Sequence, residues 1–480
     1  MSGRGPWVVV AGVTAGLMLG VGAGLAARWW PEASGPSTAP DPAAAVAPPT
    51  KAPRVTDGRP HVVLLIGCTV RLDQVTPYGG HPEATPTLQA LADRGVRFAD
   101  AVSAAPWTRA ASTALLTGHH AIEVGMIEPG PGANRRRLAD EVDTLAEKLQ
   151  RAGYTTVGTT ANPNLNELFG FHQGFDHYLE VSEQWGTRHV AKVPGRQVVD
   201  GLLARVDELP VDGSPLYLQA MLIDAHEPRA APPRAVARMV DDDELPERVG
   251  IYRVNLRKFD EAVKQLLEGL AERGIDDPLV VVVSDHGEGL AYPLHHGKGH
   301  GTFTYSSAVR MPWLVAGPGV AEGHVVRGVA SQVDVLPTLL ELTGTSRDGY
   351  GGPGHSWAAA VRGETDRTDR DVAWVDTWFQ DASRVAAYRS DRACHRDTVD
   401  LGANEARRLR PKAACYARPD DPWADRPLDD VPAEALDELD RWRAARWEAF
   451  EGFAHTRDVR PGAGLEDHLE ALGYLQDDEP

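Results

Sequence analysis

Short aliphatic runs, each followed at once by polar residues, are the feature that most restricts what this chain can fold into. They cover residues 62–66, 216–223 and 279–283. A strand is aliphatic along its length when both of its faces are buried, as happens in a parallel sheet covered by helices on each side. The sequence therefore predicts a central, mostly parallel sheet rather than a sheet with one face in water.

Helical patterns alternate with these strands. We expect helices over residues 87–95, 143–152, 197–208 and 253–273, and one more strand over residues 155–160. Such alternation is typical of an α/β fold in which helices cover both faces of the sheet. The 480 residues suit one large α/β domain with a smaller appendage. Because the apolar pattern weakens after about residue 344, we expect a smaller C-terminal α+β subdomain over residues 346–480.

Polar clusters stand where the predicted strands end. Cys68–Asp73, Asp224–Pro228 and Ser284–Glu288 each follow a strand, and His295–His300 lies in a glycine-rich loop further on. Ligands of open α/β sheets bind at the carboxyl ends of the strands, and Asp, His and Cys are common ligands of divalent cations. A single cluster of this kind is more typical of a cap or a hydrogen-bonded loop. Together, the clusters predict one metal site at one sheet edge.

The N-terminus carries a candidate membrane segment. Residues 6–28 contain a single charge, Arg28, and are long enough to cross a bilayer as a helix. We expect a signal anchor or a signal peptide preceded by a cytoplasmic n-region over residues 1–5, with a buried cytoplasmic helix as the alternative. Residues 29–59 are rich in Pro and Ala and indicate an extended linker. The globular part is then expected in the periplasm or outside the cell.

The charge and the cysteines set further limits. The formal net charge of -19 argues against nucleic acid as a partner, because phosphate backbones need a basic surface. The three cysteines are Cys68, Cys394 and Cys415. In an oxidising compartment the last two could form one disulfide, and otherwise they are two unrelated thiols.

A series of motifs in the same order resembles the opening and core of the sulfatases, a family of the alkaline phosphatase superfamily. The matching stretches are residues 61–66, Tyr78-Gly, Thr85–Leu88, Leu91–Phe98, Trp107–Gly118, Phe169–Asp176, Asp224–Pro228, Ser284–Glu288, Tyr305–Pro312, Asp334–Thr338 and Leu472–Leu475. The resemblance implies an alkaline-phosphatase-like sheet sandwiched by helices and a sulfatase-like catalytic domain over residues 60–345. It covers the C-terminal part of the chain only sparsely.

The resemblance also implies a set of metal ligands. Asp285 and His286 match the metal-ligand pair of the family. Cys68 stands where the family has its first aspartate ligand, after the first strand, and Thr108 stands at the nucleophile position beside the metal. A thiolate is a good zinc ligand and a poor calcium ligand. We expect a divalent metal, Zn, Mn or Ca, with a buried neutral thiol and a weakened or lost metal as the alternative.

The same comparison implies the catalytic residues. Thr108 would attack the ester, and His226 matches a histidine that contacts the bound oxyanion. His300 matches a histidine of the late loop, and Lys298 is a nearby cation. In-line displacement at sulfur or phosphorus needs a nucleophile, a cation and a proton donor, and these residues supply one of each.

The nucleophile segment departs from the pattern of the family. Sulfatases carry Cys or Ser within Cys/Ser-x-Pro-x-Arg and convert it to formylglycine, whereas this chain has Thr108-Arg-Ala-Ala-Ser112. Threonine cannot become that aldehyde, and Ala110 and Ser112 replace the Pro and the Arg. Relatives with a Thr nucleophile are typically phosphotransferases or phosphoesterases. Arg109 or Arg71 could replace the missing cation.

These residues predict a hydrolase of sulfate or phosphate esters that uses a divalent metal and a Thr nucleophile. The expected partner is a sulfated or phosphorylated small molecule or glycan. Because Cys68, Ala110 and Ser112 depart from the pattern, the first alternative is a catalytically impaired binding protein with the sulfatase fold. The second alternative is a transferase that moves a phosphoryl head group.

Overall fold

The structure is a computed structural model of the chain. It describes residues 54–474 with gaps at 55, 128–135, 182–191, 241–244, 294–296, 380–381, 398–412, 419, 422–425, 452–457 and 473. All of the described residues belong to one compact unit, Ala47–Pro480. The predicted membrane segment and most of the predicted linker lie outside the described residues. Within the described part of the chain, no helix combines the length and the apolar character that a membrane span requires.

Within the described residues, the main sheet has nine strands and is mostly parallel. Eight of them lie in the order β11-β2-β10-β6-β1-β5-β3-β4, and β9 pairs with β2. Their bounds are β1 Val62–Gly67, β2 Val96–Val102, β3 Thr155–Thr160, β4 His177–Glu180, β5 Leu216–Leu222, β6 Leu279–Ser284, β9 Arg310–Met311, β10 Trp313–Ala316 and β11 His324–Ser331. Among them β10 runs antiparallel to both of its neighbours. The predicted fold class is confirmed.

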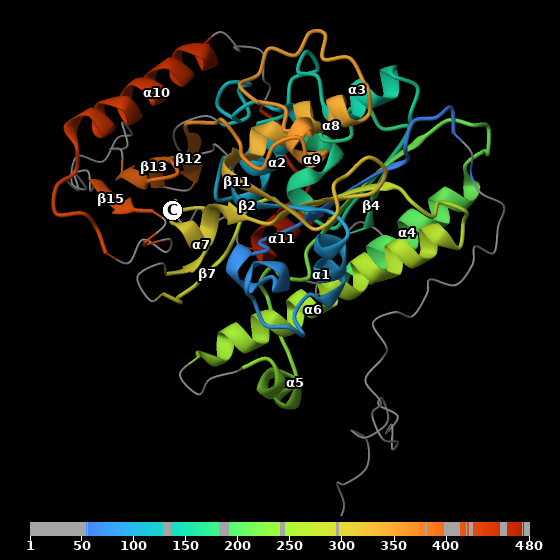
Figure 1. The fold of residues 1–480 in the computed structure, drawn as a ribbon, viewed down its shortest axis with the longest axis horizontal. Helices are drawn as coiled ribbons and strands as arrows, with labels where there is room; N and C mark the ends of the chain where they lie inside the picture. The colour runs from blue at the N-terminus through green and yellow to red at the C-terminus, as the bar shows by residue number, and fades with distance from the viewer. Residues whose placement is uncertain are drawn as a thin grey trace, which may run out of the picture. The chain divides into compact units, whose positions relative to one another are not determined.

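Helices cover both faces of this sheet (Figure 1). One layer holds α1 (Pro86–Asp93), α4 (Gly195–Glu208) and α6 (Glu247–Ala271), and the other holds α2 (Thr108–Thr117), α3 (Leu145–Arg151), α8 (Val335–Leu342) and α9 (Ala358–Val361). Between the two layers, strand β1 is completely buried. The central strands are aliphatic for this reason, and their polar neighbours are confined to the strand ends.

The remaining elements of this part of the chain are short. They are α5 (Pro233–Arg238), α7 (Ser306–Val309), the two-stranded sheet of β7 (Gly289–Leu290) and β8 (Lys298–Gly299), and the 3₁₀ turns η1 (Leu72–Gln74), η2 (Thr76–Tyr78), η4 (Pro163–Leu165), η5 (Glu167–Phe169) and η8 (Gln332–Asp334).

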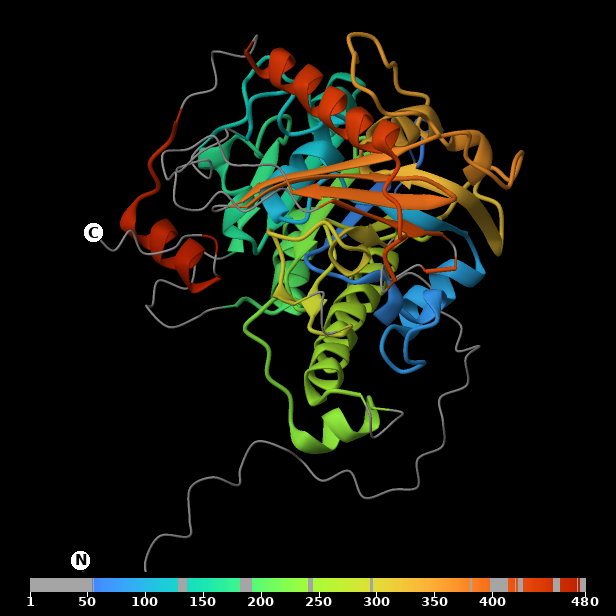
Figure 2. The ribbon, with the colours of Figure 1, turned by 90° about the vertical axis from the view of Figure 1, so that its left-hand side faces the viewer.

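A second sheet follows the main one in the chain. It is antiparallel, in the order β12 (Ala373–Phe379), β13 (Ala382–Tyr388), β14 (Arg392–Asp397) and β15 (Ala413–Ala417). Helix α10 (Ala433–Glu451) packs on β13 and β14, as Figure 2 shows. Cys394 and Cys415 face each other in the β14–β15 register and form a disulfide.

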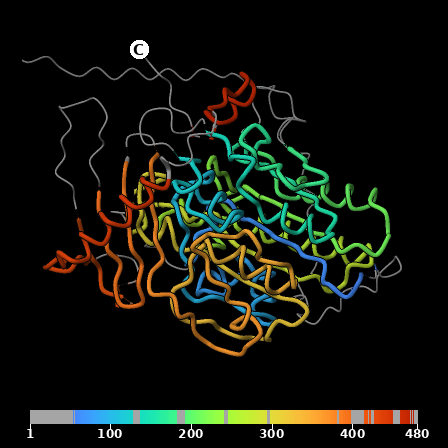
Figure 3. Tube along the Cα trace, turned by 90° about the horizontal axis from the view of Figure 1, so that it is seen from above, coloured from blue at the N-terminus to red at the C-terminus, as the bar shows by residue number. Residues whose placement is uncertain are grey.

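The last helix returns to the main sheet. In Figure 3 the red helix α11 (Ala463–Ala471) lies beside the teal and green segments, where it packs on η4. Leu469, Leu472 and Tyr474 join the main hydrophobic core. The last described residue, Tyr474, therefore lies in the same hydrophobic core as strand β1.

Candidate active site

Four adjacent strands of the main sheet deliver polar residues to one edge. Strands β6, β1, β5 and β3 are neighbours and run parallel. Asp285 follows β6, Cys68 follows β1, Asp224 follows β5 and Asn162 follows β3. Since the carboxyl ends of parallel strands meet at one edge, residues far apart in the sequence gather there.

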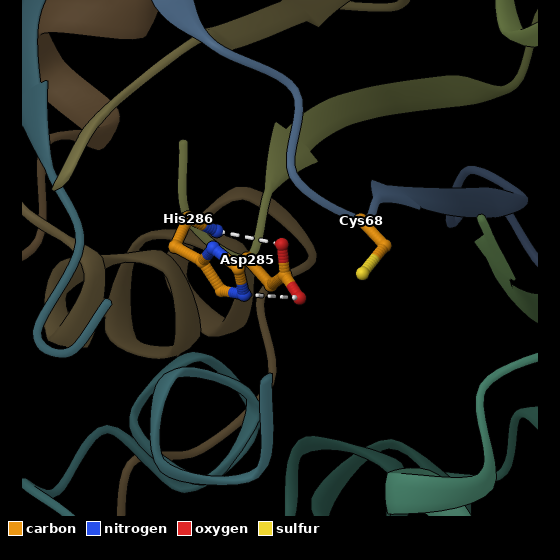
Figure 4. Close-up of side chains that lie close together, drawn as sticks. All are labelled: Cys68, Asp285 and His286. Carbon is orange, nitrogen blue, oxygen red and sulfur yellow. Dashed lines mark hydrogen bonds and ion pairs between the residues drawn. The ribbon is translucent and has the colours of Figure 1, made fainter. Parts of the chain in front are cut away.

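Cys68, Asp285 and His286 form the centre of this edge (Figure 4). One ligand atom of each lies within 4.8 Å of the others, and all three residues are completely buried. The sulfur of Cys68 points from the end of β1 toward the carboxylate of Asp285. The sequence prediction that these three residues meet is therefore matched by their positions.

The turn after β1 places Cys68 opposite Asp285. Thr69 adopts a left-handed conformation with φ 59°, which is rare for a β-branched residue. This turn lets the Thr69 N–H donate to Asp285 Oδ1 at 2.9 Å and the Thr69 carbonyl accept from Tyr252 Oη at 2.6 Å. The strained backbone is thus held by two hydrogen bonds at the point where the chain meets the candidate ligands.

The tautomer of His286 places two hydrogen-bond acceptors, His286 Nε2 and Asp285 Oδ2, opposite each other. The Nδ1 of His286 lies 2.8 Å from the carbonyl of Gly287, which can only accept, so Nδ1 carries the proton of the neutral ring. Burial lowers the pKa of His286 to about 4, which keeps the ring neutral. Its Nε2 lone pair therefore lies 3.4 Å from Asp285 Oδ2, an oxygen with no hydrogen-bond partner among the described residues.

This arrangement fits a cation. A lone pair and an unpartnered carboxylate oxygen, buried side by side, repel each other unless a positive charge lies between them. Burial, and then the charge of Asp285, raise the pKa of the Cys68 thiol well above its usual value, so a thiolate here also requires a compensating cation. The donor set of one sulfur, one oxygen and one nitrogen suits zinc better than calcium.

Thr108 is the first residue of α2 and lies against the cluster. Its Oγ1 is 3.6 Å from Cys68 Sγ and 3.4 Å from His286 Nε2. Helix α2 begins after Trp107 without a side-chain cap, so its N-terminal N–H groups and dipole favour negative charge close to this hydroxyl. The predicted nucleophile and the predicted Asp–His pair therefore lie together.

His226 and His300 complete a group of three histidines. The ring centre of His300 is 5.0 Å from that of His226 and 4.6 Å from that of His286. Glu288 Oε1 lies 3.7 Å from His300 Nδ1, and Arg229 Nη1 donates to Glu288 Oε2 at 3.0 Å. Burial alone would raise the pKa of Glu288, but His300 and Arg229 lower it to about 2, so this buried carboxylate is charged.

The predicted cation Lys298 takes a different position from its neighbour His300. Lys298 lies on β8, where it pairs with Leu290, and its exposed side chain makes no hydrogen bond or ion pair with a described residue. Lys192, which the sequence analysis missed, instead donates to the carbonyl of His226 at 2.6 Å and to the carbonyl of Asp224. Burial lowers the pKa of Lys192 to about 8. A lysine close to the site is present, but it supports the backbone that carries His226.

The two candidate arginines have other contacts. Arg71 binds Asp73 at 2.6 Å, which gives Asp73 a structural role. Arg109 is completely buried, lies 3.6 Å over the ring of Phe169 and donates to Asn164 Oδ1 at 2.9 Å. Burial lowers the pKa of Arg109 to about 9, and the nearby Tyr474 acts in the opposite direction. Arg109 is the arginine of the two that lies close to Tyr474.

Two further residues belong to the site. Tyr474 Oη lies 2.8 Å from Thr108 Oγ1, and Asn162 Nδ2 donates to Cys68 Sγ at 3.3 Å. Asn162 follows β3, so the strand-end rule could have found it. Tyr474 belongs to the tail motif Leu472–Leu475, but nothing in the sequence places that motif at the site.

The comparisons with known proteins agree with this architecture. A sequence model described as Sulfatase matches residues 60–345. The chain belongs to the sulfatase family. Relatives of this sulfatase-family chain include human arylsulfatase A, 27% identical over 335 residues that cover 59% of this chain and 64% of the relative. The ulvan-active sulfatase of Formosa agariphila is 24% identical, and the match covers 55% of this chain and 58% of the relative.

Solved structures share the fold over a larger part of the chain. A protein solved in complex with its substrate D-glucosamine-2-N,6-O-disulfate superposes with a TM-score of 0.66 at 16% identity, covering 82% of this chain and 99% of that one. The phosphonate monoester hydrolase of Silicibacter pomeroyi gives 0.64 at 17% identity, with 83% and 96% covered. At this identity the likeness shows the fold alone. By sequence, the chain spans about three fifths of the length of the curated relatives that it matches.

Proposed function

We propose that this sulfatase-family chain hydrolyses sulfate or phosphate esters and that Thr108 attacks the ester directly. The observation that carries the proposal is the position of Thr108 Oγ1, at the N-terminus of α2 and 3.4 Å from His286 Nε2. A nucleophile in this place approaches a tetrahedral group that the helix N-terminus and neighbouring histidines can stabilise. The rings of His226 and His300 lie beside that of His286 and supply further nitrogen atoms to the site.

A divalent metal belongs to this proposal. Cys68, Asp285 and His286 would hold it, with Thr108 beside them as the fourth candidate ligand. When bound, such a metal neutralises negative charge on the oxygens of the ester. The carbonyl of Gly287 fixes the tautomer of His286, and the Thr69 N–H binds Asp285 Oδ1. The candidate ligand atoms, His286 Nε2 and Asp285 Oδ2, are therefore held in fixed directions.

Direct attack by threonine follows from the residues of the nucleophile segment. The chain lacks the Cys or Ser that sulfatases convert to formylglycine, and Ala110 and Ser112 replace the Pro and Arg of that motif. A threonine hydroxyl is a weak nucleophile until a base removes its proton. Because His286 Nε2 is assigned to the metal, the proton of Thr108 must leave through another group of the site.

The class of substrate rests on the relatives. The names of the sequence relatives include arylsulfatases, which supports sulfuric esters. Phosphoric esters stay in the proposal because a threonine stands at the nucleophile position. A sulfated or phosphorylated small molecule or glycan fits this class. We further propose that the globular part works outside the cytoplasm, tethered by residues 6–28. The disulfide between Cys394 and Cys415 supports an oxidising compartment.

The exchange Thr108→Ala tests the nucleophile, and Thr108→Ser is its matched control. We expect the Ala variant to lose at least about 10³-fold in kcat/KM, because no hydroxyl remains to attack. The Ser variant keeps a hydroxyl and should retain measurable turnover. Hydrolysis of an aryl sulfate and of an aryl phosphate diester, followed by release of the phenol, measures both variants and shows which ester is preferred. Full activity of Thr108→Ala would exclude Thr108 as the nucleophile.

Metal content tests the second half of the proposal. Purified protein should contain about one zinc or manganese ion per chain, and Asp285→Asn should lower the affinity for that ion at least 10-fold. Asp73→Asn is the control, since Asp73 also follows β1 but binds Arg71. Elemental analysis after dialysis, together with zinc titration, gives both results. Wild-type protein that binds no metal would favour the binding protein over the enzyme.

A further inference from the structure

Tyr474 brings a phenol hydroxyl to the candidate site from the far end of the described chain. Its side chain is almost completely buried, and Leu469 and Leu472 from the same segment pack in the main hydrophobic core. Helix α11, which precedes it, packs on η4 directly after Asn162. The phenol is therefore a fixed part of the interior and keeps a defined position in the site.

The phenol oxygen bridges two residues of the proposed mechanism. Tyr474 Oη lies 2.8 Å from Thr108 Oγ1 and 3.0 Å from His226 Nε2. Asn162 Nδ2 donates to the same oxygen at 3.4 Å. Among the described residues no hydrogen bond joins Thr108 to His226 directly, so the phenol is the connection between them.

The protons of this chain have one consistent direction. His226 Nδ1 lies 2.5 Å from the carbonyl of Glu227, which only accepts, so Nδ1 of the neutral ring carries the proton and Nε2 is an acceptor. Burial, followed by the charge of His300, lowers the pKa of His226 well below its usual value and keeps the ring neutral. Tyr474 therefore donates its single proton to His226.

The contact between Thr108 and Tyr474 then has only one possible donor. A phenol carries one proton, and in this arrangement that proton points to His226. Thr108 must therefore donate its hydroxyl proton to Tyr474 Oη. At 2.8 Å this is the shortest of the contacts that Thr108 Oγ1 makes with the side chains of the site.

We infer that Tyr474 is a catalytic residue that relays the proton of Thr108 to His226, an inference that rests on the proposed function. As Thr108 Oγ1 bonds to the sulfur or phosphorus atom, its proton moves to Tyr474 Oη and the phenol proton moves to His226 Nε2. The bond to the leaving oxygen breaks, and that oxygen keeps the electron pair and takes a proton from water. In the second half water attacks the same atom and releases one proton, and the departing Thr108 recovers its own proton along the same path.

The exchange Tyr474→Phe tests the relay, because it removes the hydroxyl and keeps the buried ring. We expect kcat to fall about 10²- to 10⁴-fold, with little change in KM. Tyr217→Phe is the matched control, since Tyr217 is equally buried on β5 and donates to Gln219 Oε1 at 2.7 Å, outside the site. That control should stay within about two-fold of the wild-type rate.

Two further measurements separate a relay from a merely structural role. His226→Ala should lose a similar factor, and the double variant with Tyr474→Phe should lose no more than either single variant, because the two groups act in series. The wild-type rate should also be measured in mixtures of water and heavy water. If two protons move in the same step, a plot of the rate against the deuterium fraction should be curved. A straight line for the wild type, or additive losses in the double variant, would overturn the relay.

The remaining outcomes distinguish this inference from the proposed function. If Thr108→Ala is inactive while Tyr474→Phe matches the wild type, the nucleophile stands and the relay is wrong. If Tyr474→Phe is faster than the wild type, the phenol blocks the oxyanion position and the relay is again wrong. If the wild type hydrolyses neither ester, or Thr108→Ala keeps full activity, the proposed function and the relay fall together.

Discussion

Asp376 is a buried carboxyl group of the second sheet. It lies on β12 and is 2% exposed, and its Oδ2 has no hydrogen-bond partner among the described residues. Burial raises the pKa of Asp376 to about 7, which Arg443 and Arg446 partly oppose and Glu123 reinforces. The side chain is therefore protonated at mildly acidic pH and becomes a charge in the interior above neutral pH.

This charge predicts a loss of stability with rising pH. In the unfolded chain Asp376 releases its proton near pH 3.8, whereas in the folded chain it holds the proton to about pH 7. The folded state therefore binds more protons in this interval, so the contribution of Asp376 to stability is complete below pH 3.8 and is lost as the pH rises through 7. Asp376→Asn removes the titrating group.

The comparison of the two pH profiles measures the effect. Relative to Asp376→Asn, the wild type should lose up to about 4 kcal/mol in the free energy of unfolding between pH 4 and pH 8. Denaturant unfolding at each pH gives both profiles. Asp212→Asn, an exposed carboxyl group, should leave the wild-type slope unchanged above pH 5. Parallel profiles for the wild type and Asp376→Asn would contradict the buried charge.

Single residues of the candidate site differ in how far the sequence could predict them. Cys68, His226 and Asp285 follow aliphatic strands, so the parallel sheet alone brings them to one edge. Tyr474 is 366 positions from Thr108 in the chain, and only the packing of the last helix decides that they touch. Lys192 and Lys298 look alike in the sequence. The half-buried position of Lys192 and the exposed position of Lys298 depend on segments outside the long strands and helices, and such segments carry no periodic signal.

At the scale of elements, burial on both faces explains what the sequence could predict. Strands β1, β3, β5 and β6 were expected within one residue of their ends, because all four are neighbours inside the sheet and are buried along almost their whole length, including the threonines of β3. Helix α6 begins six residues before its predicted start at Arg253, since Pro246 precedes a polar first turn that the apolar pattern does not mark.

Strands β2, β10 and β11, near one end of the sheet, were not predicted, because they lack the continuous apolar pattern of the central strands. Strand β2 carries half-buried polar residues, β10 has only four residues, and β11 contains a register shift between Val326 and Val329. None of these has the continuous aliphatic run or the strict alternation by which a strand is recognised. Their pairing depends on partners distant in the chain, so the edge of the sheet is a product of tertiary structure.

At the scale of the whole molecule, the second sheet is tied to the main one by polar contacts. Arg418 pairs with the half-buried Asp100 of β2, and the backbone N–H of Asp376 donates to the carbonyl of Ala104 at 3.0 Å. Tyr388 Oη donates to the carbonyl of Thr304 at 2.7 Å. Unfolding of the second sheet alone would leave these groups without partners, which costs about 1–3 kcal/mol for each buried group. The two sheets should therefore unfold together.

The disulfide offers a test of this coupling. It links residues 21 positions apart, and such a loop stabilises a folded chain by about 3 kcal/mol through the unfolded state. The double exchange Cys394→Ser and Cys415→Ser should lower the midpoint of the whole unfolding transition by about 3–5 °C, because the loss is spread over one large cooperative unit. Calorimetry measures this shift, and reductant should shift the wild type equally and leave the double variant unchanged.

The shape of the transition decides between one unit and two. Trp374 and Trp442 stack in the second sheet and its covering helix, whereas Trp313 stacks on Phe98 in the main sheet. Replacing Trp374 or Trp313 by Phe, one at a time, assigns the fluorescence change to each sheet. If the contacts of Asp100, Ala104 and Thr304 hold the sheets together, the two tryptophan probes should report the same unfolding midpoint in the disulfide-free protein. An early transition reported by Trp374 alone would mean that the second sheet opens while the sheet that carries the candidate site remains folded.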